Sequence, residues 1–136
     1  MSKCFLDTNV IVYSYDDREP AKRVRAADLV AALVDAGAAV ISTQVIQEFA
    51  SVALTKLDLS LDAARQAVGM LGSLHIVTIT PDVVCRAISL RERHRLNYWD
   101  ACIVAAAEDA GCAVLYSEDF RPGPLLGDLQ VVNPFA

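Results

Sequence analysis

The sequence lacks an apolar stretch long enough to cross a membrane, although 54% of its 136 residues are hydrophobic. The apolar-rich segment at residues 26–42 is interrupted by Asp28 and Asp35, whereas a membrane span needs about 18 or more apolar residues in a row. The N-terminal residues also lack the apolar segment and small-residue cleavage site of a signal peptide. These absences predict a cytoplasmic protein without a membrane partner, and the length predicts a single domain over residues 1–136.

Cysteine and histidine are scarce, and their spacing excludes two common kinds of site. The four cysteines lie far apart among apolar residues, without a C-x-x-C pair: Cys4, Cys85, Cys102 and Cys112. We expect buried free thiols rather than a disulfide framework or a zinc site. The chain has two histidines, and neither is placed with a Ser or Cys in a way that suggests nucleophilic catalysis.

Positive charge is also in short supply, with 12 Lys and Arg against 17 Asp and Glu and a net charge of −5. Nucleic-acid binding usually requires a basic face, so the composition by itself argues against such a partner. The positions of the acidic residues decide whether this objection holds.

Short β-rich segments alternate with helical segments along the chain. Strands are expected at residues 3–7, 38–42, 75–79, 113–117 and 129–132, and helices at 20–36, 44–57, 61–74, 81–94 and 98–110. Proline, Ser, Thr or Asn at helix starts and glycine after helix ends mark most of these boundaries. The strands lack hairpin turns and are mostly apolar on both faces. This pattern predicts an α/β three-layer sandwich, with a short parallel sheet of four to five strands flanked by helices.

Acidic residues follow two of the expected strands. Asp7 ends the first strand, and Glu118 and Asp119 follow the fourth. Ligands of parallel α/β sheets bind beyond the carboxyl ends of the strands, so these acids can face one crevice. An Asp that follows a strand also often caps the next helix or forms an Asx-turn, which explains each of them separately.

Two further acids lie on expected helices. Glu48 stands at the edge of an apolar stripe, where a solvated side chain is the favoured explanation. Asp100 has apolar neighbours three and four positions on and no basic partner there. A helix N-terminus capped by Asn97 explains why a carboxylate is tolerated at residue 100. It does not explain the apolar surroundings.

Four acids that converged without a cation would repel one another strongly. A cluster of oxygen ligands without His or Cys suits Mg²⁺, with Mn²⁺ as a possible substitute. Such ions serve phosphodiester hydrolysis, since one lowers the pKa of a water and a second stabilises the leaving oxygen. The acids therefore indicate a metal-dependent hydrolase of phosphodiesters.

Four segments together resemble the PIN-domain nucleases: "FLDTNVIVY", "QVIQEF", "NYWDACIVAAA" and "LYSEDF". Their order and spacing are most similar to the VapC-type toxins of toxin–antitoxin pairs, and the resemblance covers the whole chain. It implies a PIN-like fold and a Mg²⁺-dependent endoribonuclease that is usually dimeric and is neutralised by a small antitoxin.

The resemblance also implies roles for individual residues. The acidic positions that catalyse and bind metal are Asp7, Glu48, Asp100 and Asp119, and the supporting polar positions are Thr8, Asn9 and Ser117. The family pattern Ser/Thr-x-Asp selects Asp119 as the fourth acid, while Glu118 can contribute.

The location of the acids answers the objection from charge. The four acids and Glu118 carry five negative charges, as many as the whole net charge of −5. Arg91, Arg93 and Arg95 precede the helix of Asp100, where they can contact the RNA backbone. A solvated helix end favoured by the helix dipole explains these arginines equally well.

Two other functions compete with the nuclease. A phosphotransfer receiver domain would need a Lys near the end of its last strand, and the lysines lie at positions 3, 22 and 56. A catalytically silent PIN-like module that binds nucleic acid or protein would be expected to have lost an acid. The apolar segments "DLVAALV" and "AVGMLGSL", with the resemblance, predict a homodimer.

Overall fold

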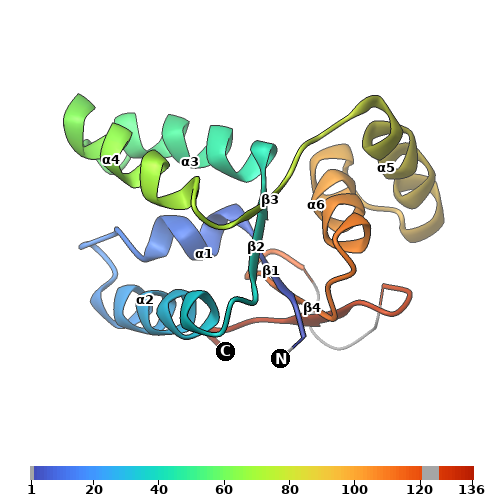
Figure 1. Ribbon diagram of the computed structural model, residues 1–136, viewed down its shortest axis with the longest axis horizontal. Helices are drawn as coiled ribbons and strands as arrows, with labels where there is room; N and C mark the ends of the chain where they lie inside the picture. The colour runs from blue at the N-terminus through green and yellow to red at the C-terminus, as the bar shows by residue number, and fades with distance from the viewer. Residues whose placement is uncertain (1, 121–125) are drawn as a thin grey trace.

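The computed structural model describes residues 2–120 and 126–136. Within them, parallel strands form one sheet in the order β3-β2-β1-β4-β5. Helices α1 to α4 lie on one side of this sheet and α5 and α6 on the other (Figure 1). The strands are β1 (Cys4–Leu6), β2 (Ala39–Ser42), β3 (His75–Val77), β4 (Val114–Tyr116) and β5 (Gln130–Val132). The predicted α/β three-layer sandwich is therefore confirmed.

Five of the helices lie where the sequence predicts them, and one was missed. The helices are α1 (Thr8–Tyr13), α2 (Pro20–Asp35), α3 (Thr43–Leu54), α4 (Leu61–Leu71), α5 (Pro81–His94) and α6 (Tyr98–Asp109). Helix α1 was missed because its apolar residues continue the apolar run of β1, and a six-residue helix shows too little of its period to be recognised.

Side-chain caps fix the starts of most of the predicted helices, whereas α2 begins at Pro20 without one. The side chains of Ser60, Thr80 and Asn97 accept hydrogen bonds from backbone N–H groups at the starts of α4, α5 and α6. Each bond satisfies a donor that has no partner within its helix. The ends of α2 and α6 are followed by Gly37 (φ 66°) and Gly111 (φ 71°), where the left-handed backbone favours glycine.

The core lies on both faces of the sheet, and helix α6 is the most deeply packed helix. All seven residues from Ala101 to Ala107 are buried, which explains the apolar surroundings of Asp100. Cys4, Cys102 and Cys112 are buried free thiols as expected, but the prediction was wrong for Cys85, which is exposed on α5. Val83 and Val84 before it suggested a buried position, but Arg86 follows it and the helix turns the Cys85 side chain toward solvent.

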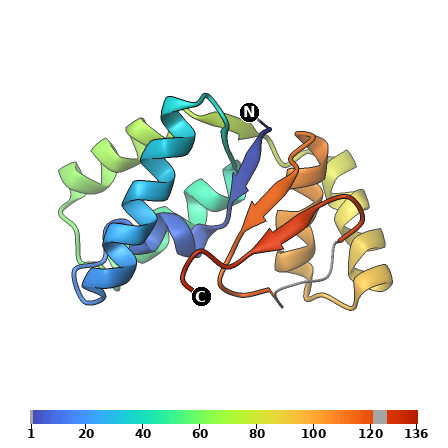
Figure 2. The same ribbon diagram turned by 90° about the horizontal axis from the view of Figure 1, so that it is seen from below.

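The strand order determines where a crevice can form. The chain leaves the central strand β1 toward β2 on one side, and the later strand β4 pairs with β1 on the other side. The carboxyl ends of β1 and β4 therefore meet at a topological switch point, where ligands of such sheets bind. Leu6 is paired with Tyr116, so Asp7 and Ser117 emerge side by side. Figure 2 shows β1, β4 and β5 in this arrangement.

Among the residues that the structure describes, no helix has both the length and the apolar character that a membrane crossing requires.

Candidate functional site

Asp7 is a buried carboxylate at the carboxyl end of β1. Its side chain accepts hydrogen bonds from the hydroxyl of Ser117 (2.7 Å) and from the backbone N–H of Thr8 (2.7 Å). Asp7 is 5% exposed. Burial raises its pKa to about 7, the two hydrogen bonds oppose this rise, and the charges of Asp119 and Asp100 add to it. None of the ion pairs between described residues involves Asp7.

Asn9 joins the ends of β1 and β4. Its side-chain amide donates to the carboxylate of Asp119 (3.0 Å) and to the hydroxyl of Ser117 (3.4 Å). Its side-chain carbonyl accepts from the backbone N–H of Glu118 (3.2 Å), and Ser117 also accepts from the N–H of Asp119 (3.1 Å). This network fixes the direction in which the Asp119 carboxylate leaves the end of β4.

Thr8 connects Glu48 to the same edge of the sheet. The Thr8 hydroxyl, in the first turn of α1, donates to a carboxylate oxygen of Glu48 on α3 at 2.7 Å. Glu48 is half-buried. The charge of Glu48 contributes to the raised pKa of Asp100, so the two carboxylates lie within range of each other across the crevice.

Asp100 combines two roles that the sequence left as alternatives. Asn97 accepts the backbone N–H of Asp100 (2.9 Å) and donates its amide to the Asp100 carboxylate (2.8 Å), as a capping residue would. Burial raises the pKa of Asp100, the Asn97 bond lowers it, and the charges of Asp119 and Glu48 raise it further. Asp100 is thus a helix-start residue whose carboxylate also faces the other acids.

Glu118 is held by a cation and a phenol that sequence reasoning did not connect with it. Lys22 on α2 pairs with one carboxylate oxygen (2.5 Å), and the Tyr13 hydroxyl donates to the other (2.8 Å). Burial alone would raise the pKa of Glu118, but the bonds from Lys22 and Tyr13 outweigh it and the pKa is lowered. Phe135 packs edge-on against Tyr13.

The neighbouring acids Glu118 and Asp119 differ in their contacts. Both oxygens of Glu118 are occupied by Lys22 and Tyr13, whereas Asp119 is exposed and contacts Asn9. No sequence signal links Lys22 to Glu118, because 96 residues separate them and neither belongs to a local motif with the other.

The donor set fits a hydrated Mg²⁺ ion in its chemistry. Within residues 2–120 and 126–136, no three His, Cys, Asp or Glu side chains lie close enough together to hold a metal ion directly. Mg²⁺ keeps several of its waters and needs only one or two direct carboxylates. The crevice offers oxygen ligands only, and burial, with the charges of Asp119 and Asp100, raises the pKa of the Asp7 carboxyl, so a cation placed there would stabilise the charged form.

A hollow of about 470 Å³ extends from Asp100 and Asp119 toward the C-terminal end of α5. His94 and Arg95 stand at its rim. Arg91 and Arg95 also line a neighbouring hollow, while Arg93 is exposed and lines neither of them. Of the three arginines named from the sequence, Arg95 is therefore the one beside the acids.

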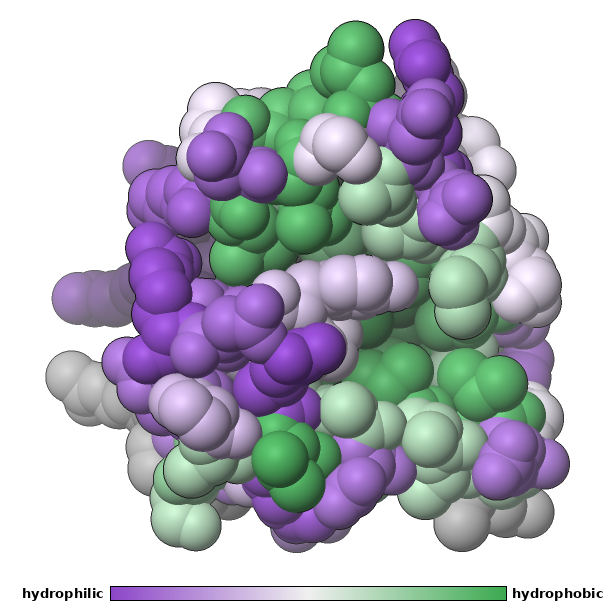
Figure 3. All heavy atoms as spheres, turned by 90° about the vertical axis from the view of Figure 1, so that its left-hand side faces the viewer, coloured by the Kyte–Doolittle hydropathy of each residue, from purple (hydrophilic) through white to green (hydrophobic). Residues whose placement is uncertain are grey.

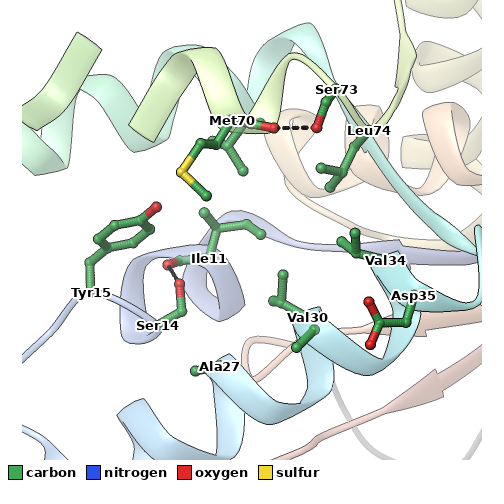
Figure 4. Close-up of a pocket in the computed structure, with 12 residues that line it drawn as sticks. Ile11, Ser14, Tyr15, Ala27, Val30, Val34, Asp35, Met70, Ser73 and Leu74 are labelled. Carbon is green, nitrogen blue, oxygen red and sulfur yellow. Dashed lines mark hydrogen bonds between the residues drawn. The ribbon is translucent and has the colours of Figure 1, made fainter. Parts of the chain in front are cut away.

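A second concave region lies on the other side of α1 and is apolar. It is a groove of about 540 Å³ between α1, α2 and α4. Figure 4 shows Ile11 of α1, Val30 and Val34 of α2 and Met70 of α4 around it, with Leu74 from the turn after α4. Apolar side chains gather around a hollow on the corresponding face of the molecule (Figure 3).

The fold is shared with solved structures of toxin–antitoxin proteins. A toxin–antitoxin complex from Klebsiella pneumoniae has a TM-score of 0.69 and 22% identity, covering 97% of this chain and 98% of that one. VapBC2 from Rickettsia felis, bound to a promoter DNA fragment, has a TM-score of 0.67 and 18% identity, with coverages of 96% and 97%. VapC20 from Mycobacterium tuberculosis, a toxin that cleaves the sarcin–ricin loop, has a TM-score of 0.63 and 18% identity, with coverages of 86% and 90%.

At these identities the structural likeness establishes the fold alone. No curated protein matches the sequence. The sequence model of the PIN domain matches residues 4–122, which is most of the chain. This chain therefore belongs to the PIN domain family.

Proposed function

We propose that this protein is a metal-dependent endoribonuclease, using Mg²⁺ or Mn²⁺, and that residues 1–136 form one nuclease domain. One observation carries the proposal: a buried carboxylate, Asp7, lies at the switch point of the sheet with other acids facing it and with no ion pair among the described residues. A buried charge of this kind is tolerated where a cation is bound.

Each residue of the crevice has a distinct task in this proposal. Asp7, Asp100 and Asp119 would hold the hydrated cation, in part through its bound waters, and Glu48 is oriented by its contact with Thr8. When bound, a divalent cation neutralises charge on the phosphate and lowers the pKa of a water. Ser117 and Asn9 orient the carboxylates of Asp7 and Asp119, and Glu118 holds its own turn in place through Lys22.

Arg95 is the proposed contact to the RNA backbone. It borders the hollow that contains Asp100 and Asp119, so a phosphate beside the acids would lie within its reach. Arg91 is proposed as a contact further along the strand, because it shares the neighbouring hollow with Arg95. Arg93, which lines neither hollow, has the weakest case of the three.

We further propose that the protein is the toxin of a toxin–antitoxin pair. One solved structure that shares its fold is described as a toxin–antitoxin complex, and another as a toxin. The apolar groove between α1, α2 and α4 has the chemistry that an amphipathic helix of a small antitoxin would recognise. Because α1 forms a wall of both the groove and the acidic crevice, an antitoxin helix there can extend a basic side chain to the acids.

The homodimer remains a separate proposal. The segments "DLVAALV" and "AVGMLGSL" contribute Val30 and Met70 to the same groove, which cannot hold an antitoxin helix and a second copy at once. A dimer that coexists with a bound antitoxin must therefore use another face. Light scattering at tens of micromolar protein tests it, and a monomer at that concentration would contradict it.

RNA cleavage with and without chelator tests the central proposal. We expect cleavage in Mg²⁺ or Mn²⁺ that stops on addition of EDTA and returns when the metal is restored. Robust cleavage in excess EDTA would disprove the metal mechanism. Metal-dependent binding of RNA without any cleavage would favour the silent binding module, although the four acids of the family pattern are all present.

A further inference from the structure

Gln44 is the one described residue whose buried side chain leaves a polar atom without a hydrogen bond. It lies in the first turn of α3, directly after β2, and is 7% exposed. Its amide nitrogen donates to the backbone carbonyl of Trp99 at 3.2 Å, while its amide oxygen accepts no hydrogen bond from the described residues. Turning the amide over would set that oxygen against the Trp99 carbonyl, so this carbonyl fixes the orientation of the amide.

The bond from Gln44 crosses from one layer of the fold to the other. Helix α3 belongs to the layer of α1 to α4, whereas α6 lies on the opposite side of the sheet (Figure 1). Among the described residues, no other hydrogen bond and no ion pair joins these two helices. Glu48 of α3 and Asp100 of α6 thus come from opposite layers. A shift of one layer against the other would change the separation of these two acids, and the Gln44 bond opposes such a shift.

The peptide unit between Trp99 and Asp100 is held on both sides by side chains. Its N–H, which belongs to Asp100, donates to Asn97 at 2.9 Å, and its C=O accepts from Gln44. A peptide unit is planar, so these two bonds fix the plane from which the Asp100 side chain leaves the backbone. Asn97 fixes that plane only within the start of α6, whereas Gln44 fixes it relative to α3.

Glu48 lies on the same face of α3 as Gln44, one turn further along the helix. Burial raises the pKa values of Asp100 and Cys102 on α6, and the charge of Glu48 raises both of them further. This face of α3 therefore meets the start of α6 in two ways, through the hydrogen bond of Gln44 to Trp99 and through the charge of Glu48.

Resting on the proposed function, we propose that Gln44 is a positioning residue for the metal site, which holds the first turn of α6 so that the Asp100 carboxylate keeps a fixed position relative to Glu48. Its hydrogen bond goes to the backbone, so it acts through Asp100 and not on the cation or the RNA. The unpartnered oxygen favours this role over a packing role. A buried amide oxygen without a partner lowers stability, and packing alone would be served better by an apolar side chain of similar shape.

Gln44→Met tests the proposal, because methionine has a similar shape and lacks both amide groups. The variant should melt no lower than the wild type in EDTA, since the unpartnered oxygen is removed together with the bond. Binding of Mn²⁺, followed by electron paramagnetic resonance, should weaken about tenfold or more, as when other groups that orient metal ligands are lost. The Mg²⁺ concentration for half-maximal RNA cleavage should rise by a similar factor, with little change in the KM for RNA.

A second measurement needs neither metal nor RNA. In EDTA, the ¹⁵N order parameter of the Asp100 N–H should fall in Gln44→Met below the values of the later residues of α6, because Asn97 alone then holds the peptide unit. The matched control is Gln47→Met, the same substitution at an exposed position of the same helix. It should change neither the order parameter nor the affinity for Mn²⁺.

The outcomes separate this role from the function on which it rests. A wild type that binds no Mn²⁺ would count against the proposed function and, with it, the role of Gln44. Wild-type binding that Gln44→Met retains in full would refute the positioning role alone and leave the nuclease proposal intact. A clearly lower melting temperature of Gln44→Met in EDTA would also overturn the role and assign Gln44 to packing between the layers.

Discussion

Helix α1 separates two concave regions with opposite chemistry. On one side, Thr8 and Asn9 contact Glu48 and Asp119, and the crevice is acidic. On the other side, Ile11 lines an apolar groove. The crevice lowers the stability of the folded protein because it buries a carboxylate. The groove lowers it because apolar surface stays in contact with water. Each region thus differs in the binder proposed for it, which is a cation for the crevice and an apolar helix for the groove.

Removing the buried charge of Asp7 should have the largest effect. It should lower the activity and leave the metal-free protein equally or more stable. We expect Asp7→Asn to lower RNA cleavage in Mg²⁺ more than about 100-fold, because even groups that only orient metal ligands cost about 10–100-fold. The metal-free protein should be no less stable, and at pH 8 more stable by about 1–3 kcal/mol, since one pKa unit corresponds to about 1.4 kcal/mol.

The pH dependence of that difference follows from the pKa of Asp7. The folded pKa of about 7 lies above the unfolded value of about 3.9, so the folded protein holds an extra proton between these values. The wild type therefore loses stability as pH rises from about 4 to 7, and Asp7→Asn lacks this loss. Thermal melts in EDTA at pH 5 and pH 8 measure it, with exposed Asp62→Asn as control. A variant that is less stable at both pH values would show that the Asp7 charge is compensated.

Asp100→Asn tests whether the acid belongs to the crevice or only to its helix start. As a member of the crevice, it should lose cleavage to a similar extent while the metal-free protein keeps its stability, because relief of repulsion from Asp119 and Glu48 offsets the lost helix-dipole term. If Asp100 only stabilises the start of its helix, Asp100→Asn should lower the stability of the protein by about 0.3–1 kcal/mol and leave cleavage intact. A destabilised but fully active variant would remove Asp100 from the nuclease site.

A charge in the groove should affect the partner and not the chemistry. Met70 is 68% exposed, so Met70→Lys should leave the fold intact and weaken binding of the proposed antitoxin, a small protein, by about 30-fold, the effect of losing about 2 kcal/mol at an interface. RNA cleavage by the free protein should not change.

The control for the groove is Ile88→Lys, which places the same charge at a similarly exposed position (53%) on α5. Isothermal titration of both variants with the small protein separates them. Equal losses of affinity in the two variants would show that the groove is not the docking site, and no loss in either would point to a different face.

The smallest expected effect distinguishes Glu118 from Asp119. Glu118→Gln should reduce cleavage by about tenfold or less, because its carboxylate orients the turn through Lys22 and Tyr13, whereas Asp119→Asn should nearly abolish cleavage. Binding of Mn²⁺, followed by electron paramagnetic resonance, should weaken much more in Asp119→Asn than in Glu118→Gln. The reverse order would make Glu118 the metal ligand.

The crevice and the groove differ in which of their features could be predicted from the sequence. Caps and strand ends are local, so Asn97 and Asp7 placed α6 and the sheet edge correctly. Apolar surplus is local as well, and it pointed to the segments that form the groove. Their meeting in one groove is a tertiary property, as is the ion pair of Lys22 with Glu118 across the chain. Neither follows from spacing, because each depends on how α1 and α2 pack against the sheet.

The sheet order has a consequence for synthesis of the protein on the ribosome. Asp7 and Glu48 lie in the first half of the chain and Asp100 and Asp119 in the second half, and Asp119, which follows β4, reaches the crevice only when β4 pairs with β1. A nascent chain that has not yet released β4 from the exit tunnel therefore cannot bring all four acids together. With the proposed nuclease function, the emerging polypeptide would therefore be inert toward the ribosomal RNA and messenger around it until β4 has paired with β1.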